Sequence, residues 1–260
     1  MRLENRLALI TGGGRGIGRA IALAFAREGA SIALAARTRS QIESVAEEVA
    51  CECGVETLAI ECDVADADSV KRAFAHAGEQ FGGGPDILVN NAGIAETSPF
   101  VKTNEAIWQR HLEVNLTGTF RCTSHALPAM LERGWGRVIN IASIAGKTGA
   151  PYIAAYSASK HGVLGLTRSL ALEIGASGVT VNAICPGYVD TEMTERGIEN
   201  IVARTGISAA EARTALEGMS PQNRLVTAEE VAALAVLLAS DEGRGINGQS
   251  INVDGGTVLF

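Results

Sequence analysis

The stretch that decides the fold is Arg6–Gly18, RLALITGGGRGIG, in which an apolar run passes directly into a glycine-rich loop. A helical pattern follows over Ile17–Glu28 and stops at Gly29, a residue typical of the end of a helix. Glycines allow backbone N–H groups at the start of a helix to approach a pyrophosphate closely. A tight turn without a ligand is the alternative, but it gives no reason for four glycines between residues 12 and 16. The strand–loop–helix context therefore predicts a dinucleotide site.

The composition is typical of a globular chain with a substantial core. The 260 residues are 47% hydrophobic and 20% charged, which excludes a disordered chain. Acidic residues outnumber basic ones by 29 to 22, so no basic footprint supports nucleic-acid binding. The sequence shows neither a secretory signal nor an apolar run of about 18 residues, and its five scattered cysteines indicate reduced thiols. We therefore expect a cytoplasmic protein with no membrane span, no metal and no nucleic-acid partner.

Apolar runs and helical patterns alternate along the whole chain. The runs that predict strands are Arg6–Thr11, Ser31–Ala36, Thr57–Cys62, Asp86–Asn90, Arg137–Ala142, Thr180–Cys185 and Ser250–Val253. The helical patterns are Ile17–Glu28, Ser40–Glu52, Ala67–Phe81, Thr103–Leu131 (disturbed at Pro128), Ala154–Ile174, Ser208–Glu217 and Ala228–Ser240. Apolar strands separated by helices are typical of a parallel sheet covered on both faces. The sequence thus predicts an α/β fold, a single doubly wound Rossmann-type domain over residues 1–260 with a seven-stranded parallel sheet.

The segment Asp190–Thr227 departs from this alternation because it is long and polar. A segment of this kind on a compact domain is more often a functional lid than a linker, so we expect residues 190–227 to cover the substrate. Its apolar residues and arginines suit either an acyl thioester on a phosphate-rich carrier or ordinary amphipathic helix packing. These residues are Met193, Ile198, Ile201, Val202, Leu216 and Met219, with Arg196, Arg204 and Arg213.

The end of the second strand indicates which dinucleotide is bound. Sites for NAD usually place an acidic residue there, on the ribose 2′-hydroxyl. Here the sequence reads Ala35-Ala36-Arg37-Thr38-Arg39, with no acid. Arg37 is placed to bind a 2′-phosphate, and Arg15 in the glycine loop offers a second positive contact. NADP(H) is therefore favoured, NAD(H) remains possible, and solvated surface arginines are the alternative.

Three further residues form a candidate catalytic set. Tyr156 and Lys160 lie four residues apart at the start of a helical pattern, so they share one face of the helix. The strand Arg137–Ala142 delivers Ser143 at its carboxyl end, the edge where open α/β sheets bind ligands.

With these motifs in place, the sequence closely resembles the short-chain dehydrogenase/reductase superfamily over essentially the whole chain. The pieces that carry the resemblance are Thr11–Gly18 (TGGGRGIG), Asn90-Asn91-Ala92-Gly93, Asn115, Ser143, Tyr156-Ser-Ala-Ser-Lys160, and Pro186-Gly187 with Thr191. Within the superfamily, the stretch from Tyr156 to Tyr188 is most similar to 3-oxoacyl-thioester (acyl-carrier-protein) reductases and bacterial polyketide ketoreductases.

The resemblance implies a role for each catalytic position. Tyr156 is the general acid/base, and Ser143 polarises the substrate carbonyl. Lys160 holds the nicotinamide ribose and lowers the pKa of Tyr156 from its ordinary value of about 10. Asn115 anchors a water relay behind Lys160, although its residue pattern alone also allows a polar group facing the core.

The same resemblance implies the dinucleotide contacts. Asp63 lies beside the adenine and Asn90 near the adenosine ribose, while Pro186 and Thr191 flank the carboxamide. The complete implied set is Gly12, Gly14, Arg15, Gly16, Ile17, Gly18, Arg37, Asp63, Val64, Asn90, Ala92, Gly93, Tyr156, Lys160, Pro186, Gly187, Val189 and Thr191.

The expected function is an oxidoreductase that transfers hydride between NADPH and a ketone or secondary alcohol. Reduction of a 3-oxoacyl thioester to the 3-hydroxyacyl thioester is favoured. The alternatives are a catabolic dehydrogenase for a hydroxy acid, a steroid or a cyclic alcohol, and a non-catalytic dinucleotide sensor, which has no need of Ser143, Tyr156 and Lys160. Family resemblance and the long apolar-faced helices at Thr103–Leu131 and Ala154–Ile174 predict a homotetramer.

Overall fold

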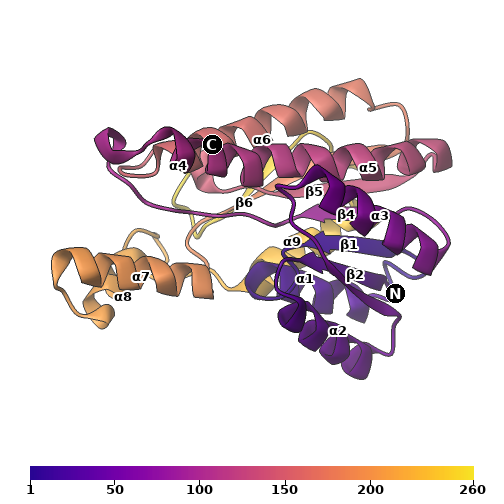
Figure 1. The fold of residues 1–260 in the computed structure, drawn as a ribbon, viewed down its shortest axis with the longest axis horizontal. Coiled ribbons are helices and arrows are strands. Elements are labelled where there is room, and N and C mark those ends of the chain that lie inside the picture. The colour runs from indigo at the N-terminus through magenta and orange to yellow at the C-terminus, as the bar shows by residue number, and fades with distance from the viewer.

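The computed structural model describes residues 1–260, which build one seven-stranded sheet in the order β3-β2-β1-β4-β5-β6-β7 (Figure 1). Every neighbouring pair of strands is parallel, so the predicted α/β doubly wound fold class is confirmed. The strands are β1 (Leu7–Thr11), β2 (Ser31–Ala36), β3 (Thr57–Glu61), β4 (Ile87–Asn90), β5 (Gly136–Ile141), β6 (Val179–Pro186) and β7 (Ser250–Val253). The helices are α1 (Gly16–Arg27), α2 (Arg39–Cys53), α3 (Ala67–Phe81), α4 (Glu105–His111), α5 (Gly118–Arg133), α6 (Ala154–Glu173), α7 (Glu192–Thr205), α8 (Ala209–Glu217) and α9 (Ala228–Ala239).

The sheet is buried on both faces because its strands are apolar throughout. Along β1, Leu7 and Leu9 face one cluster of buried residues while Ala8 and Ile10 face the other. One cluster packs α1, α2 and α9 on the sheet, and the other packs α3, α5 and the end of α6 on the opposite face. Figure 1 shows the two helical layers above and below the sheet.

The strand order reverses between β1 and β4. From β1 the chain first builds outward through β2 and β3, and then returns to add β4 to β7 on the other side. The loops after β1 and β4 therefore diverge at the carboxyl edge, which leaves a crevice where ligands bind in this class of fold.

The predicted helix Thr103–Leu131 is present as one helical run over residues 105–133, but it is not α-helical throughout and is not disturbed at Pro128. The structure has α4, then a π-helical segment at Leu112–Thr117, and then α5, which continues through Pro128. The irregularity lies around Asn115 instead of Pro128, and π-helical turns of this kind are found mostly at functional positions.

The segment 190–227 contains a helix that its polar sequence concealed. α7 spans Glu192–Thr205 and α8 spans Ala209–Glu217, and together they form an arm that projects from the body of the molecule (Figure 1). The apolar spacing on α7 is sparse, with Thr194 and Ile198 as its buried residues, so helical periodicity was hard to detect. None of the helices is both long and apolar enough to cross a membrane.

Candidate functional site

The glycine loop takes a shape that side chains would prevent. Gly12 has a φ of +64°, a left-handed conformation that favours glycine. A Cβ on Gly18 would lie 2.4 Å from the carbonyl oxygen of Gly12, so the first turn of α1 packs directly on the loop. This packing keeps the helix N-terminus open toward the cleft.

The loop after β4 is fastened to the glycine loop by one threonine and one asparagine. The Thr11 hydroxyl accepts hydrogen bonds from the backbone N–H groups of Asn91 and Ala92, both at 3.0 Å. The Asn91 side chain donates to the carbonyl oxygens of Thr11 at 2.9 Å and Gly12 at 3.0 Å. These bonds fix the width of the crevice where the strand order reverses.

A cleft of about 200 Å³ follows this crevice. It runs from the end of β2 across the glycine loop to the start of α7. The sequence-predicted residues that line it are Gly12, Gly14, Arg15, Gly16, Ile17, Arg37, Asp63, Val64, Ala92, Gly93 and Thr191. Additional lining residues include Thr38, Gln41, Asn91, Ile94, Val114, Glu192 and Met193. An elongated cleft with a glycine-lined helix N-terminus at its centre fits a dinucleotide.

Several predicted cofactor residues lie elsewhere. The Asn90 side chain is 4% exposed and donates to Thr123 Oγ1 and Asn140 Oδ1, so it braces the sheet and does not reach the cleft. Gly18 packs against Gly12 as described above. Pro186, Gly187 and Val189 lie at the carboxyl end of β6, where Gly187 donates to the Val253 carbonyl.

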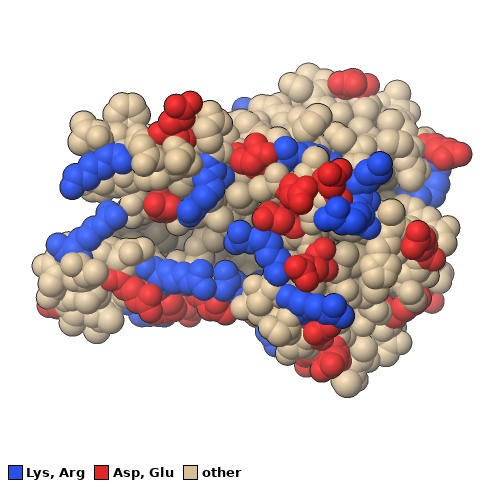
Figure 2. Space-filling view, in the orientation of Figure 1, with Lys and Arg blue, Asp and Glu red and all other residues tan.

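The basic residues at the cleft differ in their partners. Arg15 forms an ion pair with Glu192 of α7 at 2.6 Å. Arg39 pairs with Glu43, whereas Arg37 is exposed and takes part in no ion pair. Arg37 is therefore available to an anionic group at the end of β2. Figure 2 shows basic side chains on both edges of the hollow between the α7–α8 arm and the body.

Ser143 and Tyr156 meet at the carboxyl edge of the sheet. Ser143 follows β5 and caps a single helical turn, accepting a hydrogen bond from the Ala145 N–H at 3.1 Å. Tyr156 lies in the first turn of α6, with its hydroxyl near the Ser143 side chain. Burial raises the pKa of Tyr156, and the nearby Ser143 hydroxyl lowers it by less.

Lys160 lies one turn further along α6 and is 5% exposed. Its ammonium donates to the Ile141 carbonyl oxygen at 2.7 Å and lies 5.8 Å from the centre of the Tyr156 ring. Burial lowers the pKa of Lys160 to about 8, because a buried cation loses its hydration. The expected lowering of the Tyr156 pKa by Lys160 is not found: the pKa of Tyr156 is raised, chiefly by burial, and Ser143 is the group that lowers it.

Asn115 connects α6 to the loop after β4. The side chain is 1% exposed, accepts from the Ile94 N–H at 2.8 Å, and donates to the Ile94 carbonyl at 3.0 Å. It also donates to Ser159 Oγ at 2.9 Å, the residue next to Lys160. Sequence reasoning missed Ser159, although its place between Tyr156 and Lys160 was a signal.

Comparisons with known proteins show the family of this chain. A family model described as enoyl-(acyl carrier protein) reductase matches residues 12–258. The chain belongs to the short-chain dehydrogenase/reductase family. It is therefore an oxidoreductase of that family, with a nicotinamide dinucleotide as its cofactor.

Relatives with different activities are equally similar to this short-chain dehydrogenase/reductase. It is 39% identical over 254 residues to D-beta-hydroxybutyrate dehydrogenase of Rhizobium meliloti, covering 96% of this chain and 98% of the relative. It is also 39% identical over 253 residues to the 3-oxoacyl-(acyl-carrier-protein) reductase FabG of Staphylococcus aureus, covering 97% and 98% of the two chains. A crystal structure of an actinorhodin polyketide ketoreductase variant with NADPH superimposes with a TM-score of 0.94 at 38% identity, covering 98% of both chains.

In this short-chain dehydrogenase/reductase, the α7–α8 arm has a small core of its own. Ile198, Ala212, Leu216 and Leu225 pack together, so these apolar residues serve the arm itself. By contrast, Met193 is 50% exposed and Met219 is 52% exposed.

The arginines of the arm also have hydrogen-bond or ion-pair partners within the chain. Arg213 pairs with Asp190 and Glu195, and Arg196 lies 3.9 Å from Glu192. Arg204 donates to the Thr97 carbonyl at 2.9 Å, on the opposite wall of the cleft. The arginines predicted to bind a phosphate-rich carrier therefore have partners within the chain.

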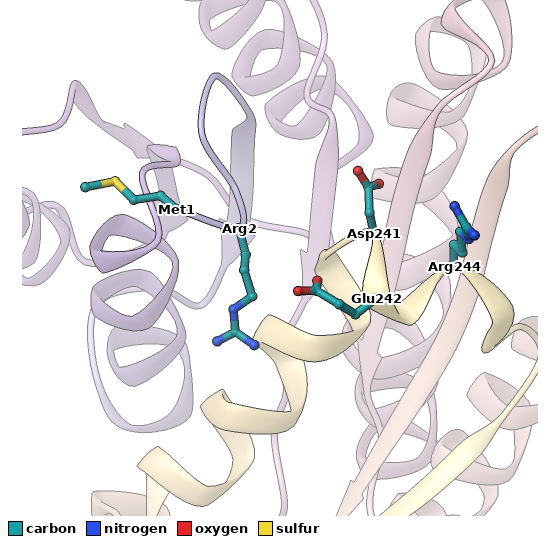
Figure 3. A pocket seen from close by; sticks show the side chains of 5 residues that line it. All are labelled: Met1, Arg2, Asp241, Glu242 and Arg244. Atoms are coloured by element: carbon teal, nitrogen blue, oxygen red, sulfur yellow. The ribbon is translucent and has the colours of Figure 1, made fainter.

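A second depression lies away from this site, where residues 1–2 approach the turn after α9 (Figure 3). Met1, Arg2, Asp241, Glu242 and Arg244 line it. Arg2 already pairs with Glu28, and Asp241 accepts from Arg137 and Trp135. These charges stabilise the local fold.

Proposed function

We propose that the protein is an NADPH-dependent reductase that converts a 3-oxoacyl thioester to the 3-hydroxyacyl thioester. The placement of Ser143, Tyr156 and the buried Lys160 together at the carboxyl edge of the sheet, beside the dinucleotide cleft, carries the proposal. When bound, the nicotinamide supplies the hydride that reduces the carbonyl carbon. The following paragraphs derive what the chain's own residues contribute.

Ser143 and Tyr156 act on the carbonyl oxygen. The Ser143 hydroxyl donates a hydrogen bond to this oxygen and polarises the carbonyl. The Tyr156 hydroxyl transfers its proton to the same oxygen as negative charge develops there. The raised pKa of Tyr156 supports this direction, because the phenol keeps its proton at neutral pH until the reaction requires it.

Lys160 and Asn115 support the proton donor. With a pKa of about 8, Lys160 is mostly charged at pH 7 and stabilises the phenolate that Tyr156 leaves behind. The bond from Lys160 to the Ile141 carbonyl aims the ammonium, and Asn115 holds the loop beside it. These residues would also hold the ribose of the cofactor.

Arg37 supports a preference for NADPH. Its guanidinium is exposed at the end of β2 without a carboxylate partner, where a 2′-phosphate would supply one. Arg15 would reach the same group by exchanging Glu192 for the phosphate.

The substrate class is supported by the relatives named as 3-oxoacyl-(acyl-carrier-protein) reductases. The equal identity to a D-beta-hydroxybutyrate dehydrogenase makes oxidation of a hydroxy acid the second candidate. The arm offers exposed Met193 and Met219 to an apolar acyl chain, whereas its arginines are already paired.

The exposed apolar side chains of α5 and α6 support assembly into a homotetramer. Phe120 is 55% exposed and Leu172 is 87% exposed, so each could pack on a second copy. Light scattering should give a mass well above the 27.0 kDa of one chain.

The test of the function follows nicotinamide absorbance with acetoacetyl-CoA, first with NADPH and then with NADH. Rapid oxidation of NADPH and slow oxidation of NADH support the proposal. If neither cofactor is oxidised, the reaction is tested in reverse with 3-hydroxybutyrate and NAD⁺ or NADP⁺. Activity only in that assay would replace the proposed reductase with a hydroxy-acid dehydrogenase.

A further inference from the structure

The loop after β4 is fastened at both of its ends, but to different parts of the molecule. At its near end, Asn91 and Ala92 are bonded to Thr11 of the glycine loop. At its far end, Ile94 is bonded to the Asn115 side chain. The far end approaches the catalytic residues, since a Cβ on Gly93 would lie 3.7 Å from the Lys160 ammonium.

His111 makes an additional bond at this far end. The imidazole is completely buried at the end of α4. Its Nε2 lies 3.1 Å from the backbone nitrogen of Glu96, and its Nδ1 lies 2.8 Å from the Ile107 carbonyl oxygen. The general fold does not require an imidazole there, since an apolar side chain would fill a buried position on a helix as well.

The two partners fix the protonation of the ring. The Ile107 carbonyl can only accept a hydrogen bond, so Nδ1 carries the proton. The Glu96 N–H can only donate, so Nε2 is unprotonated and accepts. The two hydrogen bonds therefore define one tautomer of His111.

His111 and Asn115 lie four residues apart, on either side of the change from α4 to the π-helical segment. They bind backbone groups two residues apart, at Glu96 and Ile94. We propose that His111 is a positioning residue, which together with Asn115 clamps the far end of the loop after β4 beside Lys160. The proposal rests on the proposed reductase function only for its kinetic consequence.

Loss of this clamp should affect the two ends of the loop differently. The near end keeps its four bonds to Thr11 and Gly12, so the dinucleotide cleft keeps its width. The far end loses one of the three bonds that buried side chains make to its backbone, and the groups beside Lys160 gain freedom. The expected result is a lower kcat with almost unchanged affinity for the dinucleotide.

The test compares His111→Asn with His111→Gln. The amide of asparagine occupies the position of Nδ1 and keeps the bond to Ile107, but it is too short to reach Glu96. The longer glutamine places its carbonyl oxygen near the position of Nε2 and restores an acceptor for the Glu96 N–H. Arg110→Ala is the matched control, because Arg110 contacts Glu96 only through an exposed ion pair at 2.8 Å.

Three readouts are measured on the full-length protein: hydrogen exchange of the Glu96 amide, dinucleotide affinity by fluorescence, and kcat. We expect His111→Asn to accelerate exchange at Glu96 and lower kcat about tenfold, with affinity unchanged within about threefold. His111→Gln should restore both values to within about threefold of the wild type, and Arg110→Ala should match the wild type.

Equal effects of Asn and Gln would overturn the proposal, as would a lower melting temperature with no change in exchange or kcat. A parallel loss of dinucleotide affinity would also contradict it, because the near end would then depend on His111. Exchange and dinucleotide binding need no substrate. These two measurements therefore test the role of His111 even if the protein does not reduce the thioester. Turnover of the wild type tests the proposed reductase function even if the role of His111 is refuted.

Discussion

The floor of the cleft and the arm above it are built in different ways. The floor consists of strand ends and loops set on two large buried clusters, and its polar side chains are bonded to backbone groups. The arm, α7 with α8, rests on a core of four buried residues and is covered by exposed ion pairs. Two of its side-chain contacts to the cleft walls are Glu192 with Arg15 and Arg204 with the Thr97 carbonyl.

We expect the floor of the cleft to determine the catalytic step and the arm to determine which substrate binds. Groups that hold or move a proton need fixed geometry, which a packed sheet provides. A small arm with its own core can vary in sequence without disturbing the floor. We expect substitutions in the floor to change turnover or cofactor choice, and substitutions in the arm to change substrate affinity.

Tyr156→Phe should have the largest effect on the floor. It removes the proposed proton donor and leaves the ring in place, so turnover should fall about 10³-fold. Dinucleotide affinity should stay within about threefold, because the cleft is lined by other residues. Steady-state kinetics and fluorescence titration measure the two quantities. Tyr152→Phe, on a side chain that is 61% exposed, is the control. Substantial turnover in Tyr156→Phe would refute the assigned role.

Arg37→Asp should alter the preference between NADPH and NADH and leave the catalytic residues intact. Loss of two charge-assisted hydrogen bonds to the 2′-phosphate should lower the ratio of kcat/KM for NADPH to kcat/KM for NADH about 100-fold. The measurement is this ratio in the wild type and the variant. Arg39→Asp is the matched control, since Arg39 pairs with Glu43 on its own helix. An unchanged ratio for Arg37→Asp would place the phosphate elsewhere.

Lys160→Met should stabilise the protein while it impairs turnover. Burial lowers the pKa of Lys160 from 10.5 to about 8, so charging this group in the folded state at pH 7 costs up to about 3 kcal/mol. Between these two values the unfolded chain binds more protons, so the wild type gains stability as the pH rises from about 8 toward 10.5.

Urea unfolding of the wild type and Lys160→Met at pH 7 and pH 10 measures this effect. The variant should be more stable at pH 7, and its advantage should shrink at pH 10. The wild-type reduction rate should also decline as the pH rises through about 8, where Lys160 loses its charge. A variant that is less stable at pH 7 would show that the bond to Ile141 outweighs the cost of burying the charge.

Leu216→Ala should have the smallest effect on the whole protein. The side chain is 8% exposed in the core of the arm, so its truncation costs that region about 2–4 kcal/mol. Hydrogen exchange in α8 should accelerate while exchange in β1 stays slow, and substrate KM should rise more than kcat falls. Leu259→Ala removes an 89% exposed leucine of the same size as the control. Equal acceleration in β1 would show that the arm and the sheet unfold together.

The sequence predicted the features that depend on local patterns. The seven strands were predicted because apolar runs that alternate with helical patterns are typical of a parallel sheet covered on both faces. Gly12, Arg37 and Ser143 were selected because they follow strand ends, which share one edge of a parallel sheet, and Tyr156 because it lies four residues before Lys160 on one helix face.

The features that were missed depend on contacts between distant segments. The π-helical turn between α4 and α5 carries Asn115, whose bonds to Ile94 no periodicity reveals. The inward direction of Asn90 depends on Thr123 and Asn140, and the raised pKa of Tyr156 depends on burial. His111 gave no signal either, since one histidine in a helical pattern does not indicate its partners.

A crystal structure with NADP⁺ would test the account most directly. We predict the 2′-phosphate in hydrogen-bond contact with Arg37, the pyrophosphate over Gly14–Gly16, and the nicotinamide end beside Tyr156 and Lys160. Electron density for the dinucleotide outside this cleft, or a 2′-phosphate far from Arg37, would contradict the account.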